Sequence, residues 1–141
     1  MTTLAAVHVL ESAPSVVQKF VSLLETGQAP SGLFTDDVFC DFSMPQWRLQ
    51  AVGPDQLVAL RRAGHPGPST VTRMRLDSTP GGFVLEYEEE WELGGEQFYA
   101  RQLARADVRG MAISELSVYC TGDWDTATVA QHARDVTLVR A

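Results

Sequence analysis

Glu89 is the residue whose type and setting best suit it to chemistry. It stands between Tyr87 and Trp91 in a run of alternating residues, so the three side chains share one face of a predicted strand. Burial among aromatic rings raises the pKa of a carboxyl group toward neutrality, which suits it to general acid–base catalysis. The alternative is a solvated glutamate, or one that is paired with an arginine such as Arg73 or Arg75.

Three further side chains could donate a hydrogen bond to a carbonyl or enolate oxygen, as cyclisation, dehydration and isomerisation require. They are Tyr87, Gln102 and Tyr119. The alternative for the tyrosines is to line an aromatic pocket, with the hydroxyl group reaching water. Asp41 and Glu115 are two more acids that could contact a ligand.

The remaining reactive residue types do not form a recognisable site. His8, His65 and His132 are dispersed along the chain without metal-ligand spacing, so we interpret them as surface residues and predict no metal. Cys40 and Cys120 are eighty positions apart and are predicted to be free buried thiols, with a single disulfide as the alternative. No glycine-rich phosphate loop or nucleophile elbow occurs, so we predict no cofactor.

Helices are predicted mainly in the first half of the chain. Apolar residues recur at helical spacing over 14–26, and Gly27 follows as a stop signal. A second helix is predicted from Gly53 to about Ala63, and a third over 123–136 near the C-terminus. Residues 1–13 are predicted to form an arm or a short helix.

From Ser69 the hydrophobic period changes to two, which predicts four strands. These cover about 69–77, 82–93, 96–108 and 111–120. A short strand over 38–42 precedes them, and the loop that follows holds Trp47, either as a pocket lid or wall or as plain core packing. This order predicts an α+β fold, in which a curved antiparallel sheet wraps around the N-terminal helices and encloses a central pocket.

The turns between the strands predict which side chains face that pocket. A two-residue Gly94-Gly95 turn pairs Leu93 with Glu96, and an Arg109-Gly110 turn pairs Val108 with Met111. A bulge would exchange the two faces of one strand. The predicted inner face carries Tyr87, Glu89, Trp91, Phe98, Ala100, Gln102, Ala104, Ile113, Glu115, Ser117 and Tyr119.

The same register places a cluster of apolar residues on the outer face of the sheet. It consists of Tyr99, Leu103, Leu116 and Val118, with Cys120 beside them. Apolar patches of this kind usually contact a partner, so we predict a homodimer that packs through this face.

Composition limits the range of functions. The chain has 141 residues, enough for one domain, and its formal net charge is −7. An acidic surface repels phosphate backbones, so no nucleic-acid partner is expected. No stretch approaches the apolar length of a membrane span, so we expect no membrane and a cytoplasmic location. Small residues flanked by aromatics in the predicted pocket favour a small apolar organic ligand.

The pattern resembles the nuclear transport factor 2-like superfamily. That group includes ketosteroid isomerases, limonene-type epoxide hydrolases, scytalone dehydratase and SnoaL-like polyketide cyclases. The resemblance covers residues 14–125 and is carried by 16–24 with Gly27, by 33–38, and by the exit at 122–125 after Tyr119. It implies a cone-shaped, cystatin-like α+β roll, a single SnoaL-like domain over the whole chain, and a ligand pocket inside the cone.

The resemblance also implies that several family site residues are replaced here. Phe20 stands where ketosteroid isomerases place a tyrosine, and Gln102 where they place the acid of the oxyanion hole. Their general base falls near Phe42, with Asp41 one position away. The final-strand acid of the epoxide hydrolases falls at Ser117.

These observations favour a cofactor-independent cyclase, isomerase or dehydratase that acts on a polyketide-like or terpenoid-like substrate. Glu89 would move the proton, and Tyr87, Gln102 or Tyr119 would steady the oxyanion. The alternative is a dimeric binding protein with the same pocket and no turnover, which the replaced family acids favour. The predicted pocket residues are Phe20, Trp47, Trp91, Phe98, Ala100, Glu115 and Ser117.

Overall fold

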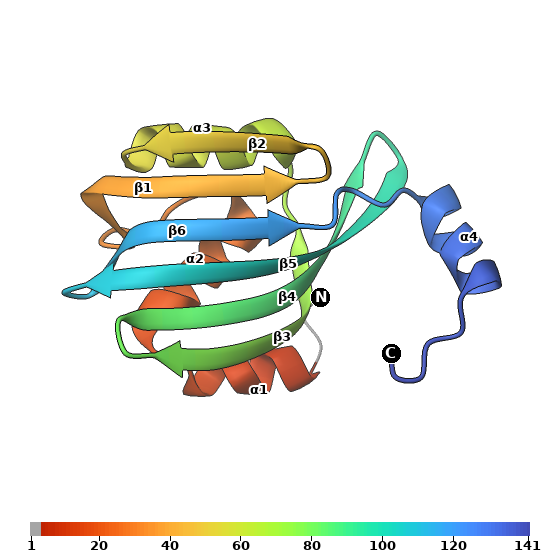
Figure 1. Ribbon diagram of the computed structural model, residues 1–141, viewed down its shortest axis with the longest axis horizontal. Coiled ribbons are helices and arrows are strands. Elements are labelled where there is room, and N and C mark those ends of the chain that lie inside the picture. Colours follow the sequence, from red (N-terminus) through yellow and green to blue (C-terminus); the bar gives the residue numbers. More distant parts are fainter. Residues whose placement is uncertain (1–3) are drawn as a thin grey trace.

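The computed structural model describes residues 4–141 and consists of four helices and six strands (Figure 1). The helices are α1 (Leu4–Ser12), α2 (Ser15–Thr26), α3 (Pro54–Gly64) and α4 (Thr126–Asp135). The strands are β1 (Phe34–Met44), β2 (Trp47–Val52), β3 (Thr70–Thr79), β4 (Gly82–Leu93), β5 (Glu96–Arg109) and β6 (Ala112–Cys120).

All six strands form one curved sheet in the order β2-β1-β6-β5-β4-β3 (Figure 1). The predicted α+β fold is confirmed, with α2 and α3 on one side of the sheet and α1 packed on β3. Neighbouring strands run antiparallel except β1 and β6, which are parallel. The first strand, β1, therefore lies beside the last strand, β6, and the two strands face the same interior.

Helix α2 forms because its apolar residues fall on one face. Val17, Phe20, Val21 and Leu24 recur every three or four residues and are all buried. Gly27 ends the helix in the left-handed conformation, at a φ of 74°, and its N–H donates to the carbonyl of Leu23 over 2.8 Å. The buried face of α2 therefore supplies one wall of the interior.

The predicted register between β4 and β5 is confirmed along both strands. Leu93 pairs with Glu96, and Glu89 pairs with Ala100, as a two-residue Gly94-Gly95 turn requires. Gly82 at the start of β4 allows a close approach of the two strands, because a Cβ there would lie 1.9 Å from the carbonyl oxygen of Ala106. The inner face of β4 is fixed by this pairing.

The predicted register of β6 is wrong, because the β5–β6 ladder contains a bulge. Arg109 pairs with Ala112, so the turn lies one residue later than predicted, and the register shifts again between Asp107 and Val108. Ser114 is the extra residue, and its hydroxyl group donates to the backbone carbonyl of Asp107 over 3.2 Å. Beyond Ser114 every side chain of β6 therefore points to the face opposite the one predicted.

The bulge has a simple energetic reason. Without it, burying Ile113 would also bury Glu115, Ser117 and Tyr119, whereas with it Leu116 and Val118 become buried instead. Apolar burial stabilises the fold by about 25 cal/mol per Å². The apolar side chains of β6 therefore decide the register, and Tyr119 is left 58% exposed.

Other differences from the prediction lie at the ends of elements. Strand β1 extends well beyond 38–42, and β2 forms where a loop was predicted. Residues 4–12 form helix α1, which is the short helix given as one of the two possibilities for residues 1–13. Helix α4 begins later than predicted and is capped by Asp125, whose side chain accepts from the N–H of Thr128.

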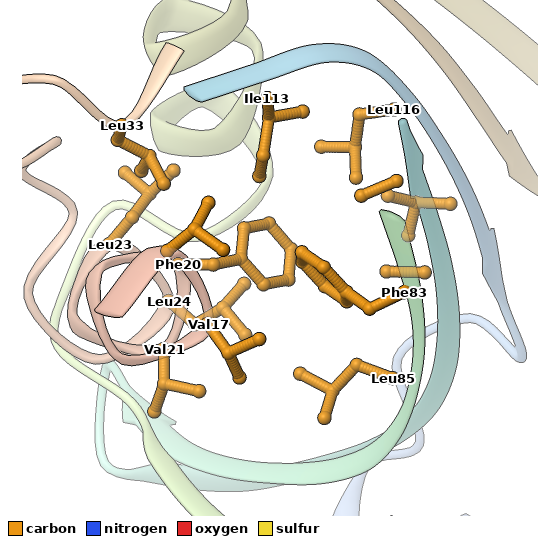
Figure 2. Close-up of a cluster of buried hydrophobic side chains, with 14 of the residues drawn as sticks. Val17, Phe20, Val21, Leu23, Leu24, Leu33, Phe83, Leu85, Ile113 and Leu116 are labelled. Atoms are coloured by element: carbon orange, nitrogen blue, oxygen red, sulfur yellow. The ribbon is translucent and has the colours of Figure 1, made fainter. Parts of the chain in front are cut away.

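One end of the interior is filled by apolar side chains (Figure 2). Phe20 lies at its centre, with its ring centroid 6.3 Å from that of Phe83. Leu85 and Ile113 have no exposed surface. No helix among the described residues is long and apolar enough to cross a membrane.

Candidate functional site

The other end of the interior is hollow. A cavity of about 290 Å³ lies between α2, α3 and the inner faces of β1, β5 and β6. This volume is at the lower end of the range for small-molecule pockets. Its wall is mostly apolar, with Phe20, Phe42, Trp47, Leu57, Leu116 and Val118 among the lining residues. Five polar residues also line it: Arg61, His65, Tyr87, Gln102 and Asp123.

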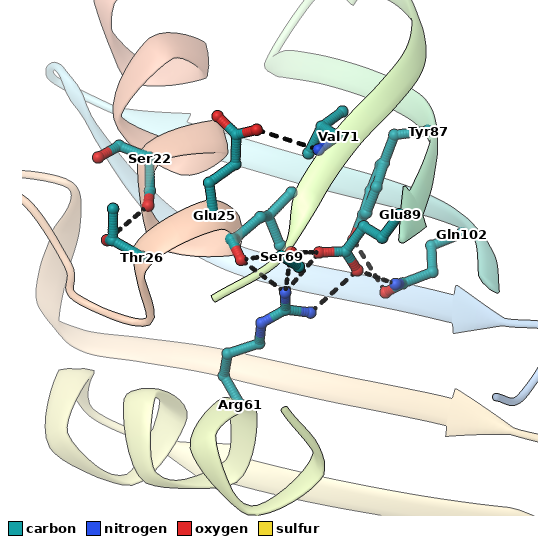
Figure 3. Close-up of polar contacts among 10 residues, drawn as sticks. Ser22, Glu25, Thr26, Arg61, Ser69, Val71, Tyr87, Glu89 and Gln102 are labelled. Atoms are coloured by element: carbon teal, nitrogen blue, oxygen red, sulfur yellow. Dashed lines mark hydrogen bonds and ion pairs between the residues drawn. The ribbon is translucent and has the colours of Figure 1, made fainter. Parts of the chain in front are cut away.

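A buried ion pair lies beside this cavity (Figure 3). Glu89 on β4 has no exposed surface, and both of its carboxylate oxygens accept from the guanidinium group of Arg61 on α3. Ser69, just before β3, places its hydroxyl oxygen 2.8 Å from Oε1 of Glu89. Gln102 on β5 donates its side-chain N–H to Oε2.

The arrangement leaves the Glu89 carboxylate fully occupied. A carboxylate offers about four lone-pair sites, and two bonds from Arg61, one from Ser69 and one from Gln102 account for them. The single proton of the Ser69 hydroxyl goes to this charged acceptor, because the Leu24 carbonyl, 2.9 Å from the same oxygen, already accepts from Arg61. The group also has no surface facing the cavity, and its charge is balanced by the arginine. Of the two interpretations of Glu89, the structure shows the paired one, with Arg61 in place of Arg73 or Arg75.

Arg61 connects the ion pair to helix α2 and to the cavity. Its Nη2 donates to the backbone carbonyl of Leu24 over 2.8 Å, and Arg62 beside it donates to the carbonyl of Gly27 over 2.9 Å. These carbonyls lie at the C-terminal end of α2, where backbone acceptors have no partner within the helix. The two arginines therefore satisfy that helix end and hold α3 against it.

Tyr87 and Gln102 form the polar part of the wall next to the ion pair. The Tyr87 hydroxyl group donates to Oε1 of Gln102 over 3.0 Å. Burial raises the pKa of Tyr87 well above its usual value, and the nearby charge of Glu89 adds to that effect. Tyr87 therefore keeps its proton at neutral pH, and because that proton is donated to Gln102, its oxygen can only accept a further hydrogen bond.

His65 lies at the end of α3 and is buried, with 7% of its surface exposed. Its ring packs edge-on against Trp91 at a centroid distance of 4.3 Å, and Trp91 stacks on Phe98 at 5.7 Å. Burial lowers the pKa of His65 to about 4, and the positive charge of Arg61 acts in the same direction. The imidazole is therefore neutral at physiological pH, and the prediction of a surface histidine is wrong.

Asp123 follows β6 at the rim of the cavity. Partial burial raises the pKa of its carboxyl group, and the negative charge of Glu89 contributes less. Both cysteines are free thiols, as predicted, but Cys120 is only partly buried and lines the cavity together with Cys40, so its predicted place on the outer face is wrong. Burial raises the pKa of Cys40 to about 11 and raises that of Cys120 as well, so both thiols stay protonated at neutral pH.

Comparison with known proteins identifies the architecture. A protein from Anabaena variabilis described as NTF2-like is similar over 87% of this chain and 96% of its own, with 22% identity and a TM-score of 0.66. A putative ketosteroid isomerase from Kribbella flavida is similar over 90% and 89%, with 18% identity and a TM-score of 0.56. The chain has the nuclear transport factor 2-like fold. No family model and no curated protein matches the sequence.

A third protein with this fold carries a small molecule. It is a hypothetical protein with a ketosteroid isomerase-like fold from Catenulispora acidiphila, determined in complex with trimethylamine. It covers 90% of this chain and 100% of its own, with 14% identity and a TM-score of 0.60. At these identities the similarity concerns the fold and not the residues of the site.

The NTF2-like fold brings four of the predicted site residues to the cavity wall: Phe20, Trp47, Tyr87 and Gln102. Trp47 lies at the rim with 65% of its surface exposed. Glu89, Trp91 and Ala100 are buried on the inner face but stand behind or beside the cavity, and Phe98 packs on Trp91.

The residues predicted from β6 are misplaced, since the bulge at Ser114 reverses that strand. Glu115, Ser117 and Tyr119 lie on the outer face, while Leu116 and Val118 line the cavity. The predicted outer patch is therefore wrong in its composition. Tyr99 and Leu103 remain outside, Leu103 with 37% exposed, and the homodimer stays a prediction.

Sequence reasoning missed Arg61, although a signal was present. Arg61 follows Leu57 by four residues, so the two lie on the same face of α3, and Leu57 is buried. A charged residue on the buried face of a helix requires a buried partner of opposite charge. That partner is Glu89, which is 28 residues away along the chain.

Proposed function

We propose that this protein binds a small, mostly apolar organic molecule in the cavity of its NTF2-like fold. The observation that carries this proposal is the state of Glu89, which is occupied by four hydrogen bonds and shut off from the cavity. In this state it cannot take a proton from a bound molecule. Binding without turnover, the alternative drawn from the sequence, is therefore the better supported function.

The polar wall indicates how such a molecule would be oriented. Arg61 is held by Glu89, Gln102 by Tyr87 and Glu89, so these groups are already positioned before a ligand enters. Groups that are held in place lose little conformational freedom on binding. The apolar wall would enclose the body of the ligand, and the polar wall would contact a single polar substituent.

The test is equilibrium binding of 1-tetralone, a two-ring ketone, measured by calorimetry. Val118→Phe fills the cavity from the inner face of β6, and we expect it to weaken binding at least about tenfold. Tyr119→Phe is the matched control, because that side chain lies on the outer face, and its affinity should equal that of the parent protein. Equal affinity in all three proteins would contradict the proposal.

A second candidate function is proton transfer, with Asp123 as the base in place of Glu89. Asp123 lines the cavity, and within residues 4–141 no hydrogen bond lowers the pKa of its carboxyl group. It would remove a proton next to a ligand carbonyl while Arg61 steadied the enolate oxygen. Exchange of the C2 protons of 1-tetralone in D₂O, lost in Asp123→Asn, would support this function, whereas no exchange above the background rate would exclude it for this probe.

A further inference from the structure

His65 is a buried polar side chain that the protein leaves without a partner. Among the described residues its Nδ1 is the one buried side-chain nitrogen or oxygen that makes no hydrogen bond. Buried polar atoms in folded proteins nearly always have a partner, and an exception costs free energy. The residue is 93% buried, so bulk water does not supply the missing bond.

The position of His65 suggests what completes it. The residue forms part of the cavity wall, next to Arg61 on the last turn of α3. Trp91 packs against the ring and is itself stacked on Phe98, so the imidazole is held in place by two aromatic rings. Because the ring forms part of the wall, a molecule that fills the hollow lies against it.

The surroundings limit the chemistry of that occupant. The imidazole is neutral, so one nitrogen donates and the other accepts a hydrogen bond. The charge of Arg61 disfavours a second cation at this place, just as it disfavours protonation of the imidazole itself. The carboxylate of Glu89 likewise disfavours an anion.

The other polar groups of the cavity wall favour a ligand that donates a hydrogen bond. The Tyr87 oxygen is left to accept, since its proton is used on Gln102, and Asp123 accepts through its carboxylate. A ketone can only accept, whereas a hydroxyl group both donates and accepts and so matches either nitrogen of the imidazole.

We propose that His65 is a ligand-contact residue and that the cavity takes a neutral apolar alcohol, whose hydroxyl group hydrogen-bonds to the imidazole. This inference rests on the proposed binding function and names the class of its ligand. The hydrogen bond to His65 would be a contact between two neutral groups at the end of α3, unlike the charged pair formed by Arg61 and Glu89.

The test compares four tetralins that differ only in the substituent at carbon 1: methyl, keto, hydroxyl and ammonium. Binding of each to the full chain is measured by calorimetry at pH 7. We expect the alcohol to bind about 2- to 10-fold more tightly than the methyl and keto compounds, the range that one hydrogen bond gives, and the ammonium compound to bind most weakly. His65→Phe should remove the preference for the alcohol, so that the ratio of its affinity to that of the methyl compound falls to about one.

A second measurement keeps the inference testable if His65→Phe does not fold. The imidazole nitrogen signals of His65 in ¹⁵N-labelled parent protein should move when the alcohol is added and stay in place with the methyl compound. His132 on α4 is the internal control and should not respond to either. Equal affinity for alcohol and methyl compounds, or unmoved His65 signals with the alcohol bound, overturns the inference alone. Failure of all four compounds to bind overturns the proposed function with it.

Discussion

The two ends of the sheet's concave face are built from the same strands, yet one is filled and the other is open. On β4 the filled end is formed by Phe83 and Leu85, and the open end begins two residues later at Tyr87. At the filled end apolar side chains meet directly, whereas at the open end the buried polar groups other than His65 form hydrogen bonds with one another around a hollow. Apolar packing therefore defines the fold at one end. At the other end a hydrogen-bonded frame, formed by Arg61, Ser69, Tyr87, Glu89 and Gln102, borders the open space.

The frame should be as important to stability as the packed end, although it is polar. Removing one partner of a buried ion pair leaves the other charge uncompensated, so we expect Glu89→Ala to lower the free energy of unfolding by about 3–5 kcal/mol. Urea unfolding at pH 7 measures the loss. The matched control is the double variant Arg61→Met with Glu89→Met, which leaves no uncompensated charge and should lose less stability than the single variant. A single variant within about 1 kcal/mol of the parent would show that the frame does not hold this end together.

A substitution at the filled end should lower the stability of the protein without weakening ligand binding. Leu85→Ala deletes a side chain with no exposed surface, and the expected loss is about 2–5 kcal/mol, from lost burial and the new hole. Because the residue lies away from the cavity wall, the folded variant should bind 1-tetralone with an affinity within about twofold of the parent. A strong loss of binding in this variant would mean that the two ends are not independent.

A fall in pH should lower the folding stability of the protein through His65, which lies at the open end. Its pKa in the folded protein is about 4, below the usual 6.5, so the unfolded chain takes up a proton first as the pH falls. The folded state therefore loses stability between about pH 6.5 and 4, and keeps it in full above that range. We expect His65→Phe to lose about 3 kcal/mol less than the parent between pH 7 and pH 4. Parallel pH profiles of the two proteins would contradict a buried, neutral imidazole.

The smallest effect is expected on the outer face. The carboxylate of Asp41 accepts from the guanidinium group of Arg48, which holds the pKa of that carboxyl below its usual value. Its neighbours Cys40 and Phe42 line the cavity, so Asp41 points the other way. Asp41→Asn should leave the affinity for 1-tetralone unchanged, and a clear loss of binding would require a route from this face to the cavity.

The contrast between β4 and β6 shows what the sequence can predict. The Gly94-Gly95 turn sets the β4–β5 register without ambiguity, so Tyr87, Glu89 and Gln102 could be placed on the inner face. The spacing of Ile113 and Leu116 does not fit strict alternation, and it is the signature of the bulge that reversed β6. A tight turn can be predicted from its local sequence, whereas the position of a bulge depends on which side chains are buried along the whole strand.

The partner of Glu89 could not be predicted for a different reason. Arg61 meets Glu89 only because α3 packs across the sheet, and β2, which precedes α3, had been predicted as a loop. His65 likewise stands in a Gly- and Pro-rich segment that is typical of an exposed turn. Contacts between elements that are far apart in sequence depend on their packing, and this chain's site is made mainly of such contacts.

We expect a ligand to bind in the hollow between α2, α3 and the inner face of β6. Nuclear Overhauser contacts between the aromatic protons of bound 1-tetralol and methyl-labelled protein test it directly. The structure predicts contacts to the methyl groups of Leu116 and Val118. Contacts to Leu103 on the outer face, with none to those two residues, would contradict it.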